Sequence, residues 1–186
     1  MLTYFNAAVR VLKLDETIYP ELVEKKRTTR YSFINVIILG IVYGLSAIFF
    51  NQEFFDVFSQ GASLMISQGI VLFIGIVVAF FLHLGAGLLI WVFLRGVGAK
   101  INFFIVYLNV GVSVVPLWLA MPGLAAIQAG IVTPIALLYA AFTGVYALLS
   151  IFTAAKSSSG LSFLRVSLAM TITIIFITCF LYLWVV

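Results

Sequence analysis

The stretch HLGAGLLIWVFLRGVGAK, residues 83–100, decides the fold class of this chain. It begins with the only histidine, continues as an apolar run, and ends in a glycine-rich cluster that contains Arg95 and Lys100. Basic residues at the end of an apolar run are typical of a helix that leaves a bilayer beside anionic headgroups. The glycines allow the unusual backbone angles of a turn. The stretch therefore predicts the end of a membrane helix and the turn to the next one.

The composition of the whole chain also predicts a membrane protein. Of its 186 residues, 65% are hydrophobic and only 9% are charged, whereas soluble domains contain about 25% charged residues. Such a chain lacks the polar side chains that a soluble core of this size needs on its surface. The single cysteine, Cys179, excludes an internal disulfide and a cysteine metal cluster.

Five apolar segments reach the roughly 20 helical residues that a bilayer requires. We therefore predict an all-α integral membrane protein that contains a bundle of five transmembrane helices. Pro116 should kink the third segment, because its ring removes one backbone hydrogen bond, whereas Pro134 can occupy the first turn of the fourth. The five segments are residues 31–50, 69–94, 103–121, 131–152 and 166–186.

The distribution of lysine and arginine predicts the orientation of the bundle. All ten precede the first segment or lie between the second and third or the fourth and fifth segments. The alternate connections, residues 51–68 and 122–130, contain neither residue type. Because short cytoplasmic loops retain positive charge, we expect a cytoplasmic N-terminus and a C-terminus outside. The basic residues that we expect to face lipid headgroups are Arg27, Arg30, Arg95, Lys100, Lys156 and Arg165.

The chain divides into a basic cytoplasmic segment, residues 1–30, and a membrane domain, residues 31–186. In the first segment, Phe5 and Val9 recur at helical spacing beside Arg10. This pattern is typical of an amphipathic helix at a membrane interface. A frayed basic terminus is the alternative, and the pattern does not decide between them.

His83 is the one ionisable residue that we expect to face the interior of the bundle, because it shares a helix face with small residues. Counting from the cytoplasmic helix ends places Ser113 at a similar depth, on a stripe with Asn109 and Pro116. These four residues form a candidate intramembrane polar site. We expect a structural histidine that is hydrogen-bonded within the bundle, and the alternative is a histidine that titrates or binds a ligand.

Small residues at intervals of four mark three of the predicted helices. Such rows let helix backbones approach closely in a membrane. We expect the first, second and fourth segments to form a tightly packed centre. The helix-packing residues are Gly40 and Gly44, then Gly75, Ala79 and Gly87, and finally Ala136, Ala140 and Gly144.

The membrane segments contain no residue arrangement typical of an enzyme. They hold no Asp, Glu, Lys or Arg, so they lack a nucleophile with a nearby base and orienting acid. They also lack the roughly three or four ligands of a zinc site. We therefore expect no catalysis, no metal, no cofactor and no nucleic-acid partner. The expected partners are membrane lipids and other membrane proteins or a second copy of the chain.

Two stretches resemble the Yip1 domain family. In HLGAGLLIWVFLRGVGAKINFFIVYLNVGVSVVPLWL, residues 83–119, a long helix ends in a basic, glycine-containing turn, and the next helix has a proline after small or hydroxyl residues. In LYAAFTGVYALLSIFTAAKSSSGLSFLRVSLAM, residues 138–170, a Gly-Leu-Ser turn precedes a last helix that begins with a basic residue. The resemblance covers the chain from Tyr31 to Val186.

The resemblance implies a five-helix membrane protein with a cytoplasmic N-terminus. Eukaryotic Yip1 proteins are associated with Rab-type small GTPases, but this chain lacks their long polar N-terminal extension, so we do not expect Rab binding. The implied location is the plasma (inner) membrane if the source is prokaryotic, and the endoplasmic reticulum or Golgi if it is eukaryotic. We expect the protein to act by binding membrane partners or by organising the local bilayer. The alternative is a small transporter or lipid-translocating protein with a cavity near His83.

Overall fold

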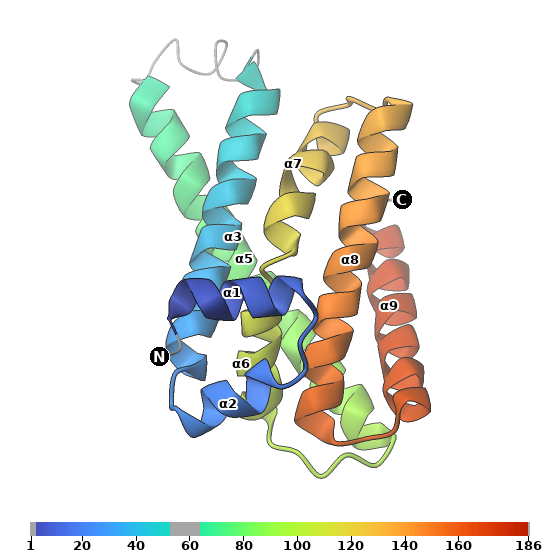
Figure 1. Ribbon diagram of the computed structural model, residues 1–186. Helices are drawn as coiled ribbons and strands as arrows, with labels where there is room; N and C mark the ends of the chain where they lie inside the picture. Colours follow the sequence, from blue (N-terminus) through green and yellow to red (C-terminus); the bar gives the residue numbers. More distant parts are fainter. Residues whose placement is uncertain (1–2, 53–63, 186) are drawn as a thin grey trace.

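The fold is all-α, as predicted. The computed structural model describes residues 3–52 and 64–185; every element of regular structure in these ranges is a helix, and 84% of the described residues are helical. The helices are α1 (Tyr4–Leu12), α2 (Ile18–Glu24), α3 (Thr28–Phe50), α5 (Leu64–Gly96), α6 (Phe103–Ser113), α7 (Leu117–Gln128), α8 (Pro134–Ser159) and α9 (Phe163–Val185) (Figure 1).

Three helices, α3, α5 and α8, are long and apolar enough to cross a membrane. The bent pair α6 and α7 makes a fourth candidate if it is one span, and the apolar part of α9, Phe163–Cys179, is shorter. Each predicted segment coincides with one of these elements. The ends shift most in α7, which continues to Gln128, and in α8, which continues to Ser159. Helix α8 ends there because Gly160 adopts the left-handed conformation that ends a helix (φ 63°) and donates its N–H to the Lys156 carbonyl at 3.1 Å.

The third predicted segment is broken at Pro116, which confirms the expected kink. The axes of α6 and α7 differ by 73°. Pro116 has no N–H to donate to the Val112 carbonyl, so the α-helical ladder stops there. The chain then turns through a tighter bond from Leu117 N to Val114 O, at 2.9 Å.

The N-terminal segment forms two helices that lie across the flank of α3, α6 and α8 (Figure 1). Helix α1, Tyr4–Leu12, coincides with the stretch for which the sequence suggests an amphipathic helix, while its placement at a membrane interface stays a prediction. The buried face is not centred on Phe5, which is 72% exposed. The residues that pack against the bundle are Ala7, Val11, Ile18, Tyr19 and Leu22, and they meet Tyr31, Val112, Val115 and Ala154.

The closest helix crossing joins α3 to α5. A Cβ atom added to Gly40 would lie 2.4 Å from Ile76 Cα, and one added to Gly75 would lie 2.7 Å from the Gly40 carbonyl oxygen. Only glycine permits the two backbones to approach so closely. Gly40 and Gly75 therefore lie at the contact between α3 and α5, whereas Gly87 of the second row lies against Tyr107 of α6.

The expectation that α8 joins this crossing is wrong. Helix α8 packs mainly against α6 and α7, and a Cβ atom added to Gly123 of α7 would lie 3.2 Å from Ala140 Cβ. Ala136 is only half-buried, and apart from the chain neighbours of Gly144 and the backbone of its own helix, no described atom lies within 4 Å of the position that its Cβ would occupy. Small residues at helical spacing show that a face can be packed, but they do not say which helix packs on it.

The connections between the long helices that carry lysine or arginine lie at one end of the bundle, which we call the basic end. Figure 1 shows that α5 and α8 end there and that α3, α6 and α9 begin there. Helix α7, by contrast, lies on the far side of α1 from the basic end (Figure 1).

Candidate functional site

The break between α6 and α7 frees backbone carbonyls that side chains of other helices then bind. Asn35 Nδ2, on α3, donates to Val112 O at 3.0 Å, and this is the carbonyl that Pro116 cannot bind. Ser150 Oγ, on α8, donates to Ser113 O at 3.0 Å. An unpaired buried carbonyl costs about 1–3 kcal/mol. The two side chains therefore stabilise the break.

Asn35 also connects the break to the N-terminal helices, although the sequence reasoning did not single it out. Its Oδ1 accepts a hydrogen bond from the Tyr4 hydroxyl at 2.6 Å. Its backbone carbonyl accepts one from Trp118 Nε1 at 3.1 Å. The signal in the sequence was an amide side chain inside an apolar segment, because such a group must find a partner away from lipid.

His83 is buried, with 5% of its surface exposed, and its ring stacks on Tyr107 at 4.2 Å between centroids. Neither ring nitrogen has a hydrogen-bond partner among residues 3–52 and 64–185. The expected hydrogen-bonded histidine is therefore not observed. Ser113 Oγ donates instead to Val110 O of its own helix, at 2.8 Å.

The structure does not bring the four residues of the predicted polar site together. Asn109 Nδ2 donates to Ser158 Oγ on α8 at 2.8 Å, and Ser113 and Pro116 belong to the break described above. His83 instead approaches α6 at Gly111. A Cβ atom on Gly111 would lie 1.9 Å from Ser32 Oγ and 2.9 Å from His83 Nε2. The absence of this one side chain lets the histidine lie against the α6 backbone.

A cavity of about 470 Å³ lies beside His83, between α3 and α5 on one side and α6 and α7 on the other. Its polar side chains are His83, Tyr43 and Gln128, and the Tyr43 hydroxyl donates to Gln128 Oε1 at 2.8 Å. Helix α7 lines it from Leu117 to Gln128, which corresponds to about 16 Å of helix. Apolar side chains on its walls include Leu39, Ala79, Leu82, Ala86, Met121 and Leu124.

At least three of the basic residues predicted to face headgroups have protein partners, and one of them is Arg27, whose Nη1 donates to the Tyr31 hydroxyl at 3.5 Å. Lys156 forms an ion pair with Glu16 of the N-terminal segment at 2.7 Å, and the Arg95 guanidinium lies 5.9 Å from the centroid of the Trp91 ring. Some positive charge at the basic end therefore holds the protein together.

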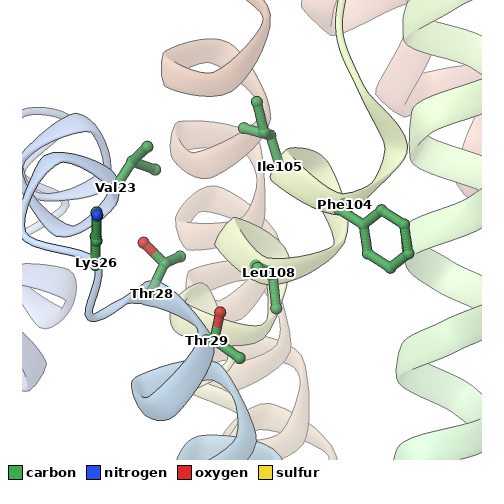
Figure 2. A pocket seen from close by; sticks show the side chains of 7 residues that line it. All are labelled: Val23, Lys26, Thr28, Thr29, Phe104, Ile105 and Leu108. Carbon is green, nitrogen blue, oxygen red and sulfur yellow. The ribbon is translucent and has the colours of Figure 1, made fainter.

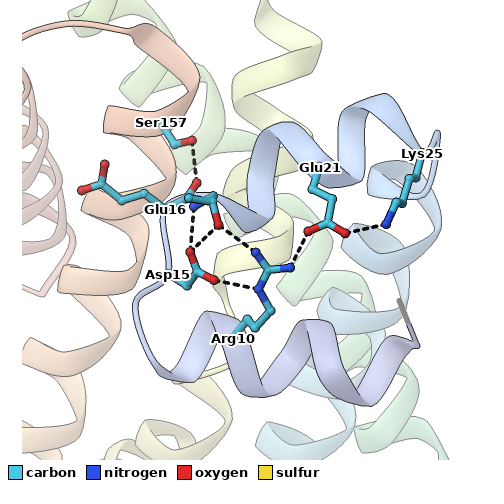
Figure 3. A network of polar contacts seen from close by, with 7 residues as sticks. Arg10, Asp15, Glu16, Glu21, Lys25 and Ser157 are labelled. Atoms are coloured by element: carbon cyan, nitrogen blue, oxygen red, sulfur yellow. Dashed lines mark hydrogen bonds and ion pairs between the residues drawn. The ribbon is translucent and has the colours of Figure 1, made fainter. Parts of the chain in front are cut away.

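A charged network connects α1 to α2 (Figure 3). Arg10 Nε lies 2.7 Å from Asp15 Oδ2, and the same guanidinium pairs with Glu21. Hydrogen bonds from Thr17 and from Arg10 lower the pKa of Asp15 to about 2. Glu21 also pairs with Lys25 at 2.5 Å. The network fixes the angle between α1 and α2. It thereby holds both helices in place against the break between α6 and α7.

In the part of the chain that the structure describes, no three His, Cys, Asp or Glu side chains are grouped so that they could hold a metal ion. The chain matches no protein-family profile, no curated protein and no solved structure.

Proposed function

We propose that this is a non-catalytic integral membrane protein that binds a lipid or a similar apolar molecule in the cavity beside His83. The observation that carries the proposal is a buried imidazole, without a partner in the described chain, on the wall of an apolar cavity. A buried polar group left unpaired costs about 1–3 kcal/mol. A ligand hydroxyl or ester carbonyl would give the ring its missing partner.

The size and lining of the cavity support a lipid-like ligand. Its volume of about 470 Å³ lies within the range of roughly 300–1,000 Å³ typical of ligand pockets. Nearly all of the lining side chains are apolar, so the ligand would present mostly hydrocarbon. A broken helix beside such a cavity also favours a lipid-translocating role, because discontinuous helices line the substrate sites of many transporters.

In this proposal five spans cross the bilayer, with the bent pair as the third, α9 as the fifth and the basic end in the cytoplasm. The ion pairs of Arg10 and Lys156 would be unfavourable in hydrocarbon, so these charged groups lie at or outside the cytoplasmic boundary of the hydrocarbon region. Helix α7, which lines much of the cavity, then lies within the membrane (Figure 1). The membrane is the plasma (inner) membrane in a prokaryote, or the endoplasmic reticulum or Golgi in a eukaryote. Membership of the Yip1 family stays a prediction.

Filling the cavity tests the proposal. Ala86 lines the cavity on the same helix as His83, whereas Leu84 is 46% exposed and does not line it. In mild detergent we expect the wild-type protein to keep bound lipid and the Ala86→Phe variant to lose it. Native mass spectrometry of the two purified proteins measures the difference. The matched control, Leu84→Phe, should keep it. Equal lipid occupancy in the two variants would contradict the proposal.

His83→Phe tests the polar contact separately, because it keeps a ring of similar shape and removes both nitrogens. We expect weaker binding of a lipid with a free hydroxyl or ester next to the ring, and little change for a saturated hydrocarbon. Loss of both ligands to the same extent would show that the ring shapes the cavity and does not bind a polar group.

A second candidate function is association with another membrane helix, and the outer face of α8 favours it. No described atom of another helix lies within 4 Å of the Cβ position on Gly144, and the neighbouring Phe142 and Val145 are 78% and 58% exposed. A small residue between bulky ones leaves room for a partner helix. We expect Gly144→Leu to reduce cross-linked oligomers in native membranes. A wild-type protein that is monomeric there would exclude self-association.

A further inference from the structure

A second pocket, of about 260 Å³, lies at the basic end between the start of α3 and the start of α6 (Figure 2). The α6 wall is apolar and the opposite wall is polar. No residue lines both this pocket and the cavity beside His83. Its lining comprises Phe104, Ile105 and Leu108 on one side, and Lys26, Thr28 and Thr29 with Val23 on the other.

Thr28 provides a buried polar group directed into this pocket. Its side chain is 5% exposed, and Oγ1 has no hydrogen-bond partner in the described ranges 3–52 and 64–185. Figure 2 shows the hydroxyl on the side of Thr28 that faces Lys26 and Val23, which line the same pocket. A buried hydroxyl without a partner is unfavourable, so a ligand that bonds to it would be favoured.

Lys26 adds a positive charge that the fold does not require. It is exposed, it forms no ion pair within the described residues, and its φ is +54°, a left-handed angle that favours glycine. The bond from Arg27 N to Leu22 O at 2.9 Å shows that Lys26 occupies the position after α2 where glycine usually ends a helix.

The pocket also adjoins the N-terminus of a long helix. Helix α3 begins at Thr28, and its N-cap residue makes no side-chain capping bond. The first N–H groups of a helix lack intrahelical acceptors and carry the positive end of its dipole. Anions, phosphate above all, bind at such positions.

We infer that this pocket binds the phosphate of an anionic phospholipid, with Lys26 and the Thr28 hydroxyl on the phosphate and the rest of the lipid against the exposed Phe104. Thr28 lies seven residues before Asn35, which contacts α1, so the pocket is about 10 Å nearer the basic end than α1. Headgroups occupy the layer directly outside the hydrocarbon. The inference therefore rests on the membrane placement proposed above, but not on what fills the His83 cavity.

Lipid titration of the purified full chain tests the inference. We expect phosphatidylglycerol to bind more tightly than phosphatidylcholine, as measured by native mass spectrometry. Lys26→Gly should weaken phosphatidylglycerol binding about fivefold, the factor for roughly 1 kcal/mol per cation near an anionic headgroup. Its thermal midpoint should not fall, because glycine accepts the left-handed angle without strain.

Two further variants separate the pocket from general charge. Lys100→Gln removes one charge at the same end of the bundle but outside the pocket, so its phosphatidylglycerol binding should stay close to that of the wild type. Thr28→Val removes the unpaired hydroxyl at nearly constant shape, so it should weaken this binding without lowering thermal stability. Equal losses in Lys26→Gly and Lys100→Gln would overturn the inference.

Two ligand controls identify the source of the phosphate. Inorganic phosphate lacks the apolar part that would contact Phe104, so it should compete poorly with phosphatidylglycerol. Competition at equal concentration would overturn the assignment to a lipid, and so would equal affinity for phosphatidylcholine. Ala86→Phe should keep phosphatidylglycerol binding here even if it empties the His83 cavity, so the two proposals fail independently.

Discussion

At the scale of single residues, Gly111 positions the histidine by having no side chain. A Cβ atom there would meet Ser32 Oγ at 1.9 Å and His83 Nε2 at 2.9 Å. Replacing a helical glycine by alanine stabilises an exposed helix by about 1 kcal/mol, but overpacking a tight interior costs about 1–3 kcal/mol. The contact at 1.9 Å is so short that we expect the clash to outweigh the gain.

The first prediction is therefore that Gly111→Ala lowers the free energy of unfolding by about 1–2 kcal/mol, seen as a lower thermal midpoint in mild detergent. Gly85→Ala is the matched control, because Gly85 is also helical and no described atom of another helix lies within 4 Å of its Cβ position. It should be as stable as the wild type or more so. If Gly111→Ala has the same thermal midpoint as Gly85→Ala, the close approach of α3 and α5 to α6 would be contradicted.

The second prediction concerns Asn35, whose side chain binds both Val112 O and Tyr4. Asn35→Leu would leave the Val112 carbonyl unpaired in an apolar environment, so we expect it to lower the free energy of unfolding by about 1–3 kcal/mol. Ser46→Ala on the same helix is the control, because Ser46 Oγ bonds only the Val42 carbonyl of its own helix. Similar stabilities for the two variants would show that the break does not need Asn35.

At the scale of elements, the charged network around Arg10 holds α1 and α2 together (Figure 3). The pKa of Asp15 is lowered to about 2 by Thr17 and Arg10, against an ordinary value of about 3.9. A lowered pKa means that the carboxylate stabilises the folded state above its unfolded pKa and loses this effect as the pH falls. The contribution of Asp15 is therefore complete above about pH 4 and lost between about pH 4 and pH 2.

The third prediction follows from this pH dependence of the Asp15 contribution to stability. Asp15→Asn should unfold at a lower temperature than the wild type near neutral pH, and the difference should shrink as the pH falls from about 4 to 2. Thermal unfolding at a series of pH values measures it. Glu24→Gln is the control, because Glu24 is exposed and forms no ion pair within residues 3–52 and 64–185. A pH-independent difference for Asp15→Asn would contradict the role of its charge.

At the scale of the whole molecule, the bent pair decides how many times the chain crosses the bilayer. Lys100 precedes α6 at the basic end, and Ile131 follows α7, 40% exposed. Figure 1 shows that α6 begins at the basic end and that α7 ends near the opposite end. This arrangement supports one bent span over a loop that re-enters on the same side.

The fourth prediction is that these two positions lie on opposite sides of the membrane. In a Cys179→Ser background, Ile131→Cys should react with a membrane-impermeant maleimide in intact cells. Lys100→Cys should react only after permeabilisation. Labelling of both cysteines from one side would exclude a single crossing by α6 and α7. The chain would then cross the membrane an even number of times.

The long apolar helices could be predicted from the sequence, since apolar length is a property of each segment alone, whereas the short helix α2 was not predicted. The kink at Pro116 was equally local, because the missing N–H belongs to that residue. The α1 helix was predictable, but its buried face was not: Ala7 and Val11 are buried while Phe5 is exposed. Small apolar residues gave a weaker signal than a phenylalanine, although they allow a closer fit to the bundle.

By itself the sequence determined an all-α chain with several helices long enough to span a membrane and with its cations gathered at one end, because hydropathy and charge are read along the chain. The tertiary structure alone decided that Asn35 binds the carbonyl freed by Pro116, that α8 packs on α7, and that His83 lies beside a cavity with no hydrogen-bond partner in the described part of the chain. These features depend on which helix faces meet. In an apolar bundle many faces are alike, and the pairing is selected by close packing between helices, which no single segment encodes.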